Sequence, residues 1–117
     1  MSESSAVQVE ASPTFQRNIR KLIKKYRSIQ ADIQPIIEQL QQGIFLGDRI
    51  PDIGYEVFKL RIRNRDAQRG KSGGYRIIYS LKSRNNIILL TIYSKSEQAD
   101  IKAEDIRQII EESTSAN

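Results

Sequence analysis

The sequence predicts an α+β fold with the element order β-α-α-β-β-β-α. Apolar residues recur at helical spacing in the first third, alternate with polar residues from Tyr55 onward, and return to helical spacing after residue 100. Strands joined by short turns run antiparallel, so we expect a mostly antiparallel four-stranded sheet with a helical hairpin and a C-terminal helix. A chain of 117 residues allows one compact core. We therefore assign residues 6–112 to a single domain and expect disorder in residues 1–5 and 113–117.

The composition excludes several kinds of chemistry. The chain has no cysteine and no histidine, which excludes disulfides, thiolate catalysis, Cys/His zinc sites and an imidazole acid or base. We expect no metal and no other cofactor. The first ten residues lack the basic and apolar regions of a secretion signal, and no stretch reaches the ~18 apolar residues of a membrane span. We therefore expect a cytoplasmic protein that has no membrane partner.

The N-terminal segment predicts a strand followed by a basic helix. Alternation from Ala6 to Glu10 indicates a short strand. Ser12 and Pro13 are typical of a helix start, because serine caps the helix and proline at the first helical position sacrifices no hydrogen bond. Six basic residues and no acid surround the apolar stripe of this helix. The stripe is Phe15, Ile19, Leu22, Ile23 and Tyr26, and the basic residues are Arg17, Arg20, Lys21, Lys24, Lys25 and Arg27.

A second helix and a loop are expected next. The helix has the apolar stripe Ile33, Ile36, Ile37 and Leu40, and Gly43 should end it. We expect Asp32 to cap it, with Pro35 in the first turn, whereas a start at Ser28 would place the proline inside a kinked helix. Residues 43–54 hold three glycines and a proline, which predicts a loop. Its apolar anchors should be Ile44, Phe45 and Leu46.

Three strands and a helix complete the prediction. Residues 55–64 alternate Phe58, Leu60 and Ile62 with Lys59, Arg61 and Arg63. Residues 75–82 place Tyr75, Ile77, Tyr79 and Leu81 on one face and Arg76, Ser80 and Lys82 on the other, where Ile78 is an exception. Residues 87–92 are continuously apolar after an asparagine turn, which is typical of a central strand. Ile101, Ile106, Ile109 and Ile110 then indicate a last helix.

Basic charge is concentrated in the predicted sheet. Residues 55–95 contain ten Lys/Arg and two Asp/Glu, a net charge of +8 that leaves −3 for the rest of the chain. Lys59, Arg61 and Arg63 share one strand face, and Arg76 joins them if the polar faces of the two strands are continuous. Four such cations could hold a phosphate and stabilise the added charge of its transition state without a metal ion.

Each candidate residue also has a purely structural interpretation. Alternating basic and apolar residues are typical of any solvated sheet face, although the lack of acids among these positions favours a phosphate site. Tyr93 ends the apolar strand and could stack on a base or assist proton transfer, but a tyrosine there also suits ordinary packing. The loop with Arg69 and Lys71 does not have the spacing of a nucleotide-binding loop and would extend the basic surface. Glu97, Asp100, Glu104 and Asp105 are expected to cap the last helix.

Two motifs resemble the RelE/ParE superfamily of bacterial toxins, especially its HigB-like and RelE-like branch. They are Gly74-Tyr75-Arg76-Ile77-Ile78-Tyr79 and Leu90-Thr91-Ile92-Tyr93-Ser94-Lys95, which follow a first strand and a helical hairpin. The resemblance covers residues 6–112. RelE-like members enter the ribosomal A site and cut messenger RNA with Lys/Arg side chains on the sheet, whereas ParE-like members poison DNA gyrase. The resemblance therefore implies the toxin of a type II toxin–antitoxin system, and the basic sheet face favours ribosome-dependent messenger cleavage.

The resemblance also assigns residues to roles. Lys59 and Arg61 resemble the family's basic pair, and Arg76 resembles the arginine of its G-Y-R motif. The family's catalytic tyrosine has no match in this chain, and Tyr93 is the candidate to replace it because it lies at the same strand end. That missing tyrosine would fall near Ile101 or Lys102, and Ser96 stands where RelE has an arginine. The RNA contacts are expected from Arg63, Arg69, Lys71, Lys82 and Lys95.

Partners and alternatives follow from the same comparison. We expect messenger RNA and the ribosome as targets, and an acidic antitoxin that covers the face from Lys59 to Arg76, with a heterotetramer as one assembly that the resemblance allows. Gyrase inhibition is one alternative. A toxin that has lost catalysis and keeps only RNA or antitoxin binding is another, for which affinity should fall steeply with salt without cleavage.

Overall fold

The computed structural model describes residues 7–64 and 74–115 and contains a five-stranded sheet in the order β1-β5-β4-β3-β2. The edge strand β1 (Gln8–Ala11) runs parallel to β5 (Asn86–Ser94). The strands β5, β4 (Tyr75–Ser83), β3 (Val57–Ile62) and β2 (Asp48–Arg49) run antiparallel in turn. The predicted α+β class is confirmed, with one strand more than expected. A two-residue strand such as β2 has no periodicity by which a sequence could reveal it.

The first helix, α1 (Pro13–Lys25), begins as predicted. The Ser12 hydroxyl accepts a hydrogen bond from the Phe15 backbone N–H at 3.0 Å and donates one to the Leu90 carbonyl at 2.7 Å. One serine therefore caps the helix and ties its start to β5. The whole predicted apolar stripe of α1 packs in the core.

The second helix, α2 (Ile29–Gln41), begins earlier than predicted, with Ser28 at its N-cap. The expectation that Asp32 caps the helix is wrong: Asp32 is a buried residue of the first turn, and Pro35 lies inside the helix. Proline removes one backbone hydrogen bond there. The added turn buries Ile29 completely, and burial of such a side chain is worth about 1.5–3 kcal/mol, which offsets the lost bond. Gly43 ends the helix region as expected, and its N–H bonds to the Leu40 carbonyl.

The loop after α2 is anchored differently from the prediction. Ile44 and Phe45 are 46% and 38% exposed, and of the three predicted anchors Leu46 packs against the core. Ile53, which is 3% exposed, holds the other end of the loop, and its carbonyl accepts a hydrogen bond from the Arg107 Nε at 3.1 Å. The loop is therefore fastened to the last helix, α3 (Ala103–Ser115), which continues into the segment expected to be disordered.

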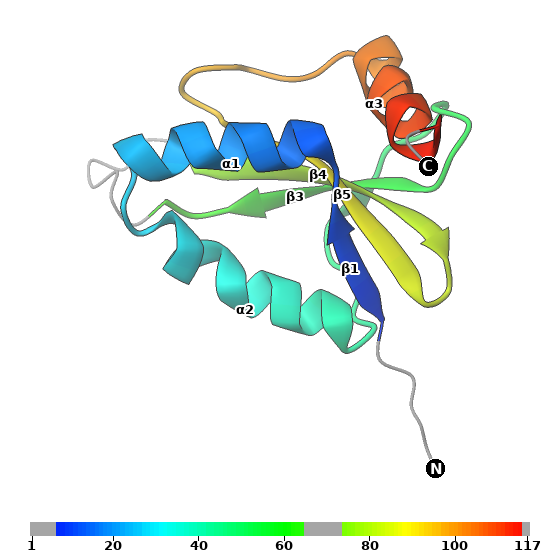
Figure 1. The fold of residues 1–117 in the computed structure, drawn as a ribbon, viewed down its shortest axis with the longest axis horizontal. Helices are drawn as coiled ribbons and strands as arrows, with labels where there is room; N and C mark the ends of the chain where they lie inside the picture. The colour runs from blue at the N-terminus through cyan, green and yellow to red at the C-terminus, as the bar shows by residue number, and fades with distance from the viewer. Residues whose placement is uncertain (1–6, 65–73, 116–117) are drawn as a thin grey trace.

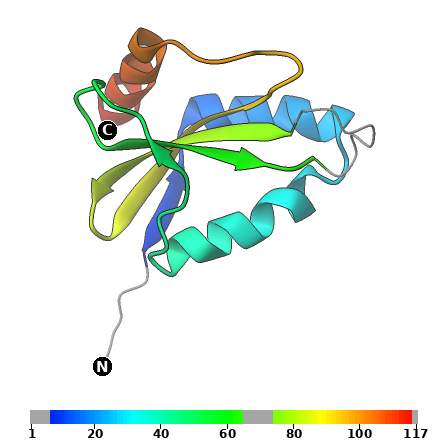
Figure 2. The same ribbon diagram turned by 180° about the vertical axis from the view of Figure 1, so that it is seen from behind.

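The sheet separates two apolar clusters, and Figure 1 shows α2 and α3 on its opposite sides. One cluster lies under α1 and α2 and receives the predicted apolar faces of β3 and β4. The other lies under α3 and includes Val57, Ile78, Ile106 and Ile110. Seen from behind in Figure 2, the chain leaves β5 by a long segment before it enters α3. The strand predicted to be central, β5, is an interior strand, but the middle position of the sheet belongs to β4.

Candidate functional site

Three of the predicted site residues form a row across the sheet. Arg61 of β3 pairs with Arg76 of β4, and Arg76 pairs with Tyr93 of β5. Directly paired residues project from the same face, and Lys59 shares it because it lies two residues before Arg61. We call Lys59, Arg61, Arg76 and Tyr93 the basic platform. It lies on the face that carries α3, since the alternate residues Leu60 and Ile62 pack under α1 and α2.

A β-bulge decides the direction of Tyr93. Leu89 pairs with Tyr79 and Thr91 pairs with Ile78, so Leu90 is an extra residue in β5. Strict alternation would send Tyr93 to the same face as Leu89, into the cluster under α1 and α2. The extra residue reverses the faces beyond it, so Ile92 enters that cluster and Tyr93 turns to the side of Arg76.

Gly74 allows β4 to begin close to the end of β3. Its φ is +81°, and a Cβ atom there would lie 2.3 Å from the Ile62 carbonyl oxygen. Residues with a side chain rarely adopt this backbone conformation, and the clash would be with the backbone of the neighbouring strand. The glycine therefore lets β4 start against the end of β3, and Arg76 lies two residues after it, opposite Arg61.

Tyr93 is only 6% exposed, and its hydroxyl lies 3.5 Å from Oδ1 of Asp100. Burial raises the pKa of the Tyr93 hydroxyl, the negative charge of Asp100 raises it further, and the positive charge of Arg76 opposes both effects. The hydroxyl therefore stays protonated at neutral pH and acts as a hydrogen-bond donor rather than as a base.

Asp100 was predicted to cap the last helix, but the structure places it against the basic platform. Its Oδ1 atom lies 3.4 Å from the Lys59 ammonium and accepts a hydrogen bond from the Ile101 N–H at 2.9 Å. The Ile101 N–H is the main cause that lowers the pKa of the Asp100 carboxyl, and Lys59 and Tyr93 contribute. Asp100 is separated from Lys59 by 41 positions, so no local pattern could have indicated this contact.

Other acids also approach the cations, contrary to the acid-free surface expected from the strand pattern. The Arg61 guanidinium lies 3.3 Å from a carboxylate oxygen of Asp48 in β2, and both side chains are exposed. Glu97, also expected at the helix cap, instead pairs with Lys25 of α1 at 2.5 Å. Exposed pairs of this kind contribute little because water and salt screen them, so an anion with more contacts can displace the acids. Glu104 and Asp105 do lie in the first turn of α3, as predicted.

The remaining predicted RNA contacts are spread unevenly. Arg63 is exposed just beyond β3, and the Lys95 N–H bonds to the Gly74 carbonyl at 3.0 Å, so both lie at the Arg76 end of the platform. Lys82 is at the far end of β4, about 20 Å from Arg76 at ~3.3 Å per residue. There it lines a pocket with Tyr55 and Ile110 instead of joining the platform. Arg69 and Lys71 fall outside the described residues.

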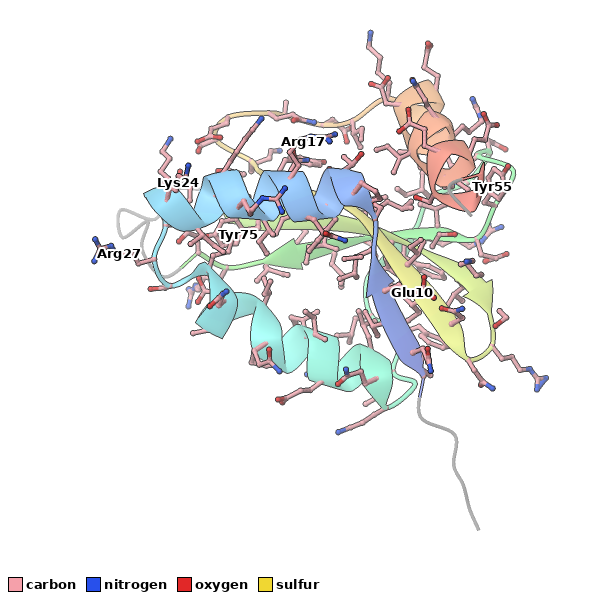
Figure 3. The ribbon with its side chains drawn as sticks, in the orientation of Figure 1. Glu10, Arg17, Lys24, Arg27, Tyr55 and Tyr75 are labelled. Atoms are coloured by element: carbon pink, nitrogen blue, oxygen red, sulfur yellow. The ribbon has the colours of Figure 1, made fainter. Side chains whose placement is uncertain are left out.

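A second basic surface lies along α1. Figure 3 shows Arg17 and Lys24 projecting from this helix and Arg27 projecting beyond its end, while Tyr75 lies in the interior. All six basic residues predicted for this segment are exposed. A cavity of about 260 Å³ between α1 and the segment after β5 joins this surface to the platform, since Lys21 and Tyr93 both line it.

Within residues 7–64 and 74–115, no cluster of three or more acidic, histidine or cysteine side chains is arranged to hold a metal ion. In the same part of the chain, no helix combines the length and the apolar character needed to cross a membrane.

The fold and the platform define a small α+β protein that gathers three cations and one tyrosine hydroxyl on one face of its sheet. The sequence model of one family, described as the RelE toxin of the RelE/RelB toxin–antitoxin system, matches residues 13–116. This chain belongs to the RelE toxin family, which confirms the resemblance found in its sequence. Membership makes it the toxin of a toxin–antitoxin pair and implies a RelB antitoxin as its partner.

Proposed function

We propose that this protein inhibits translation by cutting messenger RNA on the ribosome, without a metal ion. The observation that supports this most is the row Arg61–Arg76–Tyr93 with Lys59 beside it. Several positive charges and one neutral hydroxyl on a rigid sheet suit a phosphodiester in its transition state, where negative charge increases. The sheet supplies fixed positions, which electrostatic stabilisation requires.

In the proposed reaction, the ribose 2′-oxygen forms a bond to phosphorus and the bond from phosphorus to the 5′-oxygen breaks. Arg61, Arg76 and Lys59 stabilise the charge on the non-bridging oxygens and favour loss of the 2′-hydroxyl proton to water. Tyr93 gives its proton to the departing 5′-oxygen, because its raised pKa keeps the hydroxyl protonated at neutral pH. The products are a 2′,3′-cyclic phosphate and a free 5′-hydroxyl.

The antitoxin is proposed to be acidic and to cover the platform. Membership of the family implies a RelB antitoxin, and the charges specify which face would attract it. The basic platform and the exposed cations of α1 lie on connected surfaces, so one acidic chain could contact both.

The proposal is tested by adding the purified protein to a cell-free translation reaction and mapping messenger 5′ ends by primer extension. We expect new ends only where translating ribosomes are present, because the proposed cleavage takes place on the ribosome. Naked messenger with protein and translating ribosomes without protein serve as controls. Messenger that stays intact while the protein blocks supercoiling of relaxed plasmid by gyrase would contradict the proposal.

Replacing Tyr93 by phenylalanine is expected to lower the cleavage rate about 10²-fold, because it removes the proposed proton donor and keeps the ring. Since the pKa of Tyr93 is raised, the ratio of wild-type to variant rates should stay constant from about pH 7 to about pH 9. Single-turnover cleavage on stalled ribosomes measures both quantities. Equal rates for the two proteins would remove Tyr93 from the mechanism.

A further inference from the structure

The segment from residue 95 to residue 102 crosses beside α1 on its way from β5 to α3, and we call it the strap (Figure 1). Two acids hold it to cations on either side. Glu97 pairs with Lys25 of α1 at 2.5 Å, and Asp100 pairs with Lys59 of β3 at 3.4 Å. Lys59 belongs to the platform that the proposed function would use to act on RNA, and Lys25 belongs to the basic surface of α1 that the antitoxin would contact.

The contacts of Asp100 resemble those of a bound anion. A single oxygen of Asp100, Oδ1, accepts hydrogen bonds from the Lys59 ammonium at 3.4 Å, the Tyr93 hydroxyl at 3.5 Å and the Ile101 N–H at 2.9 Å. The first two donors are platform residues from different strands, and a phosphate oxygen accepts from the same kinds of donor. Asp100 therefore sits where an RNA phosphate would have to bind if Lys59 and Tyr93 act on it.

The strap is held in a way that allows release. The Lys59 and Tyr93 contacts are longer than the usual charged hydrogen bond, and the Asp100 side chain is 68% exposed. Beneath the strap lies the cavity of about 260 Å³, lined by Asn18, Lys21, Tyr93 and Gln98 among others. Ile101 packs against the cluster under α3 and anchors the far end. The strap can thus leave the platform without opening a packed core.

We propose that Asp100 is an internal competitor for RNA: its carboxylate fills a phosphate position between Lys59 and Tyr93, and RNA binds by displacing it and lifting the strap. This inference rests on the proposed function, because it takes the displacing anion to be an RNA phosphodiester. A phosphodiester has two non-bridging oxygens that share its charge, whereas Asp100 meets Lys59 and Tyr93 through Oδ1 alone. Ionisation supports the competition, because the lowered pKa of Asp100 keeps it charged at neutral pH.

The test compares Asp100→Asn with Glu104→Gln. Both variants lose one negative charge, but Glu104 is an exposed residue in the first turn of α3 and Asp100 lies on the platform. The asparagine keeps an oxygen that can accept the Ile101 N–H. The probe is a fluorescein-labelled single-stranded RNA of about ten nucleotides, titrated without ribosomes and followed by fluorescence anisotropy at several salt concentrations.

Asp100→Asn is expected to bind the probe about two- to fivefold more tightly than Glu104→Gln, the range set by loss of one exposed ion pair. Its affinity should also depend more steeply on salt, by about one additional phosphate contact. In the Lys59→Ala background, Asp100→Asn should change the RNA affinity little. Lys59 is the cation for which the Asp100 carboxylate and the RNA phosphate compete, and this background lacks it.

Equal affinities for the two single variants, no binding by either of them, or a gain that persists without Lys59 would each overturn the inference. These results are distinguishable from failure of the proposed function, because the binding assay requires no cleavage. Tighter binding by Asp100→Asn with intact messenger would support the competitor and contradict the cleavage. Cleaved messenger without tighter binding by Asp100→Asn would support the cleavage and contradict the competitor.

Discussion

Replacing Arg76 by alanine is expected to lower messenger cleavage about 10²- to 10³-fold, the usual effect of removing one preorganised charge from a transition state. Arg76 has the central position of the platform, with Arg61 paired to it on one side and Tyr93 on the other. It is also the cation that opposes the raised pKa of Tyr93, so its loss would make the proposed proton donor a weaker acid. One substitution thus weakens both charge stabilisation and proton donation.

The measurement is single-turnover cleavage on stalled ribosomes, with binding to the same ribosomes determined separately. Arg84→Ala is the matched control, because it removes the same charge from the exposed turn at the far end of the β4–β5 hairpin. Arg76→Lys should recover part of the rate, since it restores the charge and not the planar fork of the guanidinium. A loss of binding as large as the loss of rate would indicate that Arg76 holds RNA without acting on its transition state.

Replacing Gly74 by alanine is expected to have the largest effect on stability. Its Cβ would lie 2.3 Å from the Ile62 carbonyl oxygen, and the residue would keep a φ of +81°. The conformation costs about 1–2 kcal/mol, and the forced separation of two backbones adds about 1–3 kcal/mol. A total of about 2–5 kcal/mol is a large part of the stability of a domain of this size.

Gly54→Ala separates these two contributions. Gly54 has a φ of +94°, and a Cβ there would meet nothing within 4 Å, so this variant should show the conformational cost alone. Urea unfolding of both variants gives the difference in free energy of unfolding. If the two lose the same amount, the contact between the start of β4 and the end of β3 does not require glycine.

The features of the fold and the site that depend on residues close together in the chain were predictable from the sequence. The period of two in β3 and β4 predicted one polar face for Lys59 and Arg61, joined by Arg76 if the strands' polar faces are continuous, and the pairing of Arg61 with Arg76 confirms that continuity. The capping of α1 by Ser12 was predictable for the same reason, since serine, proline and the first apolar residue are neighbours in the chain. The start of α2 was not, because burial of Ile29 in the shared core outweighs the local preference of Pro35 for a first turn.

The sequence by itself determined the α+β class, the basic character of one sheet face and the residue types available for chemistry. Only the tertiary structure decided that Tyr93 joins Arg76, since this depends on one extra residue in β5 that alternation does not reveal. It also brought Asp48 to Arg61 and Asp100 to Lys59. The physical reason is that alternation is a steric property of each strand, whereas register and loop contacts depend on packing between segments that are distant in the chain.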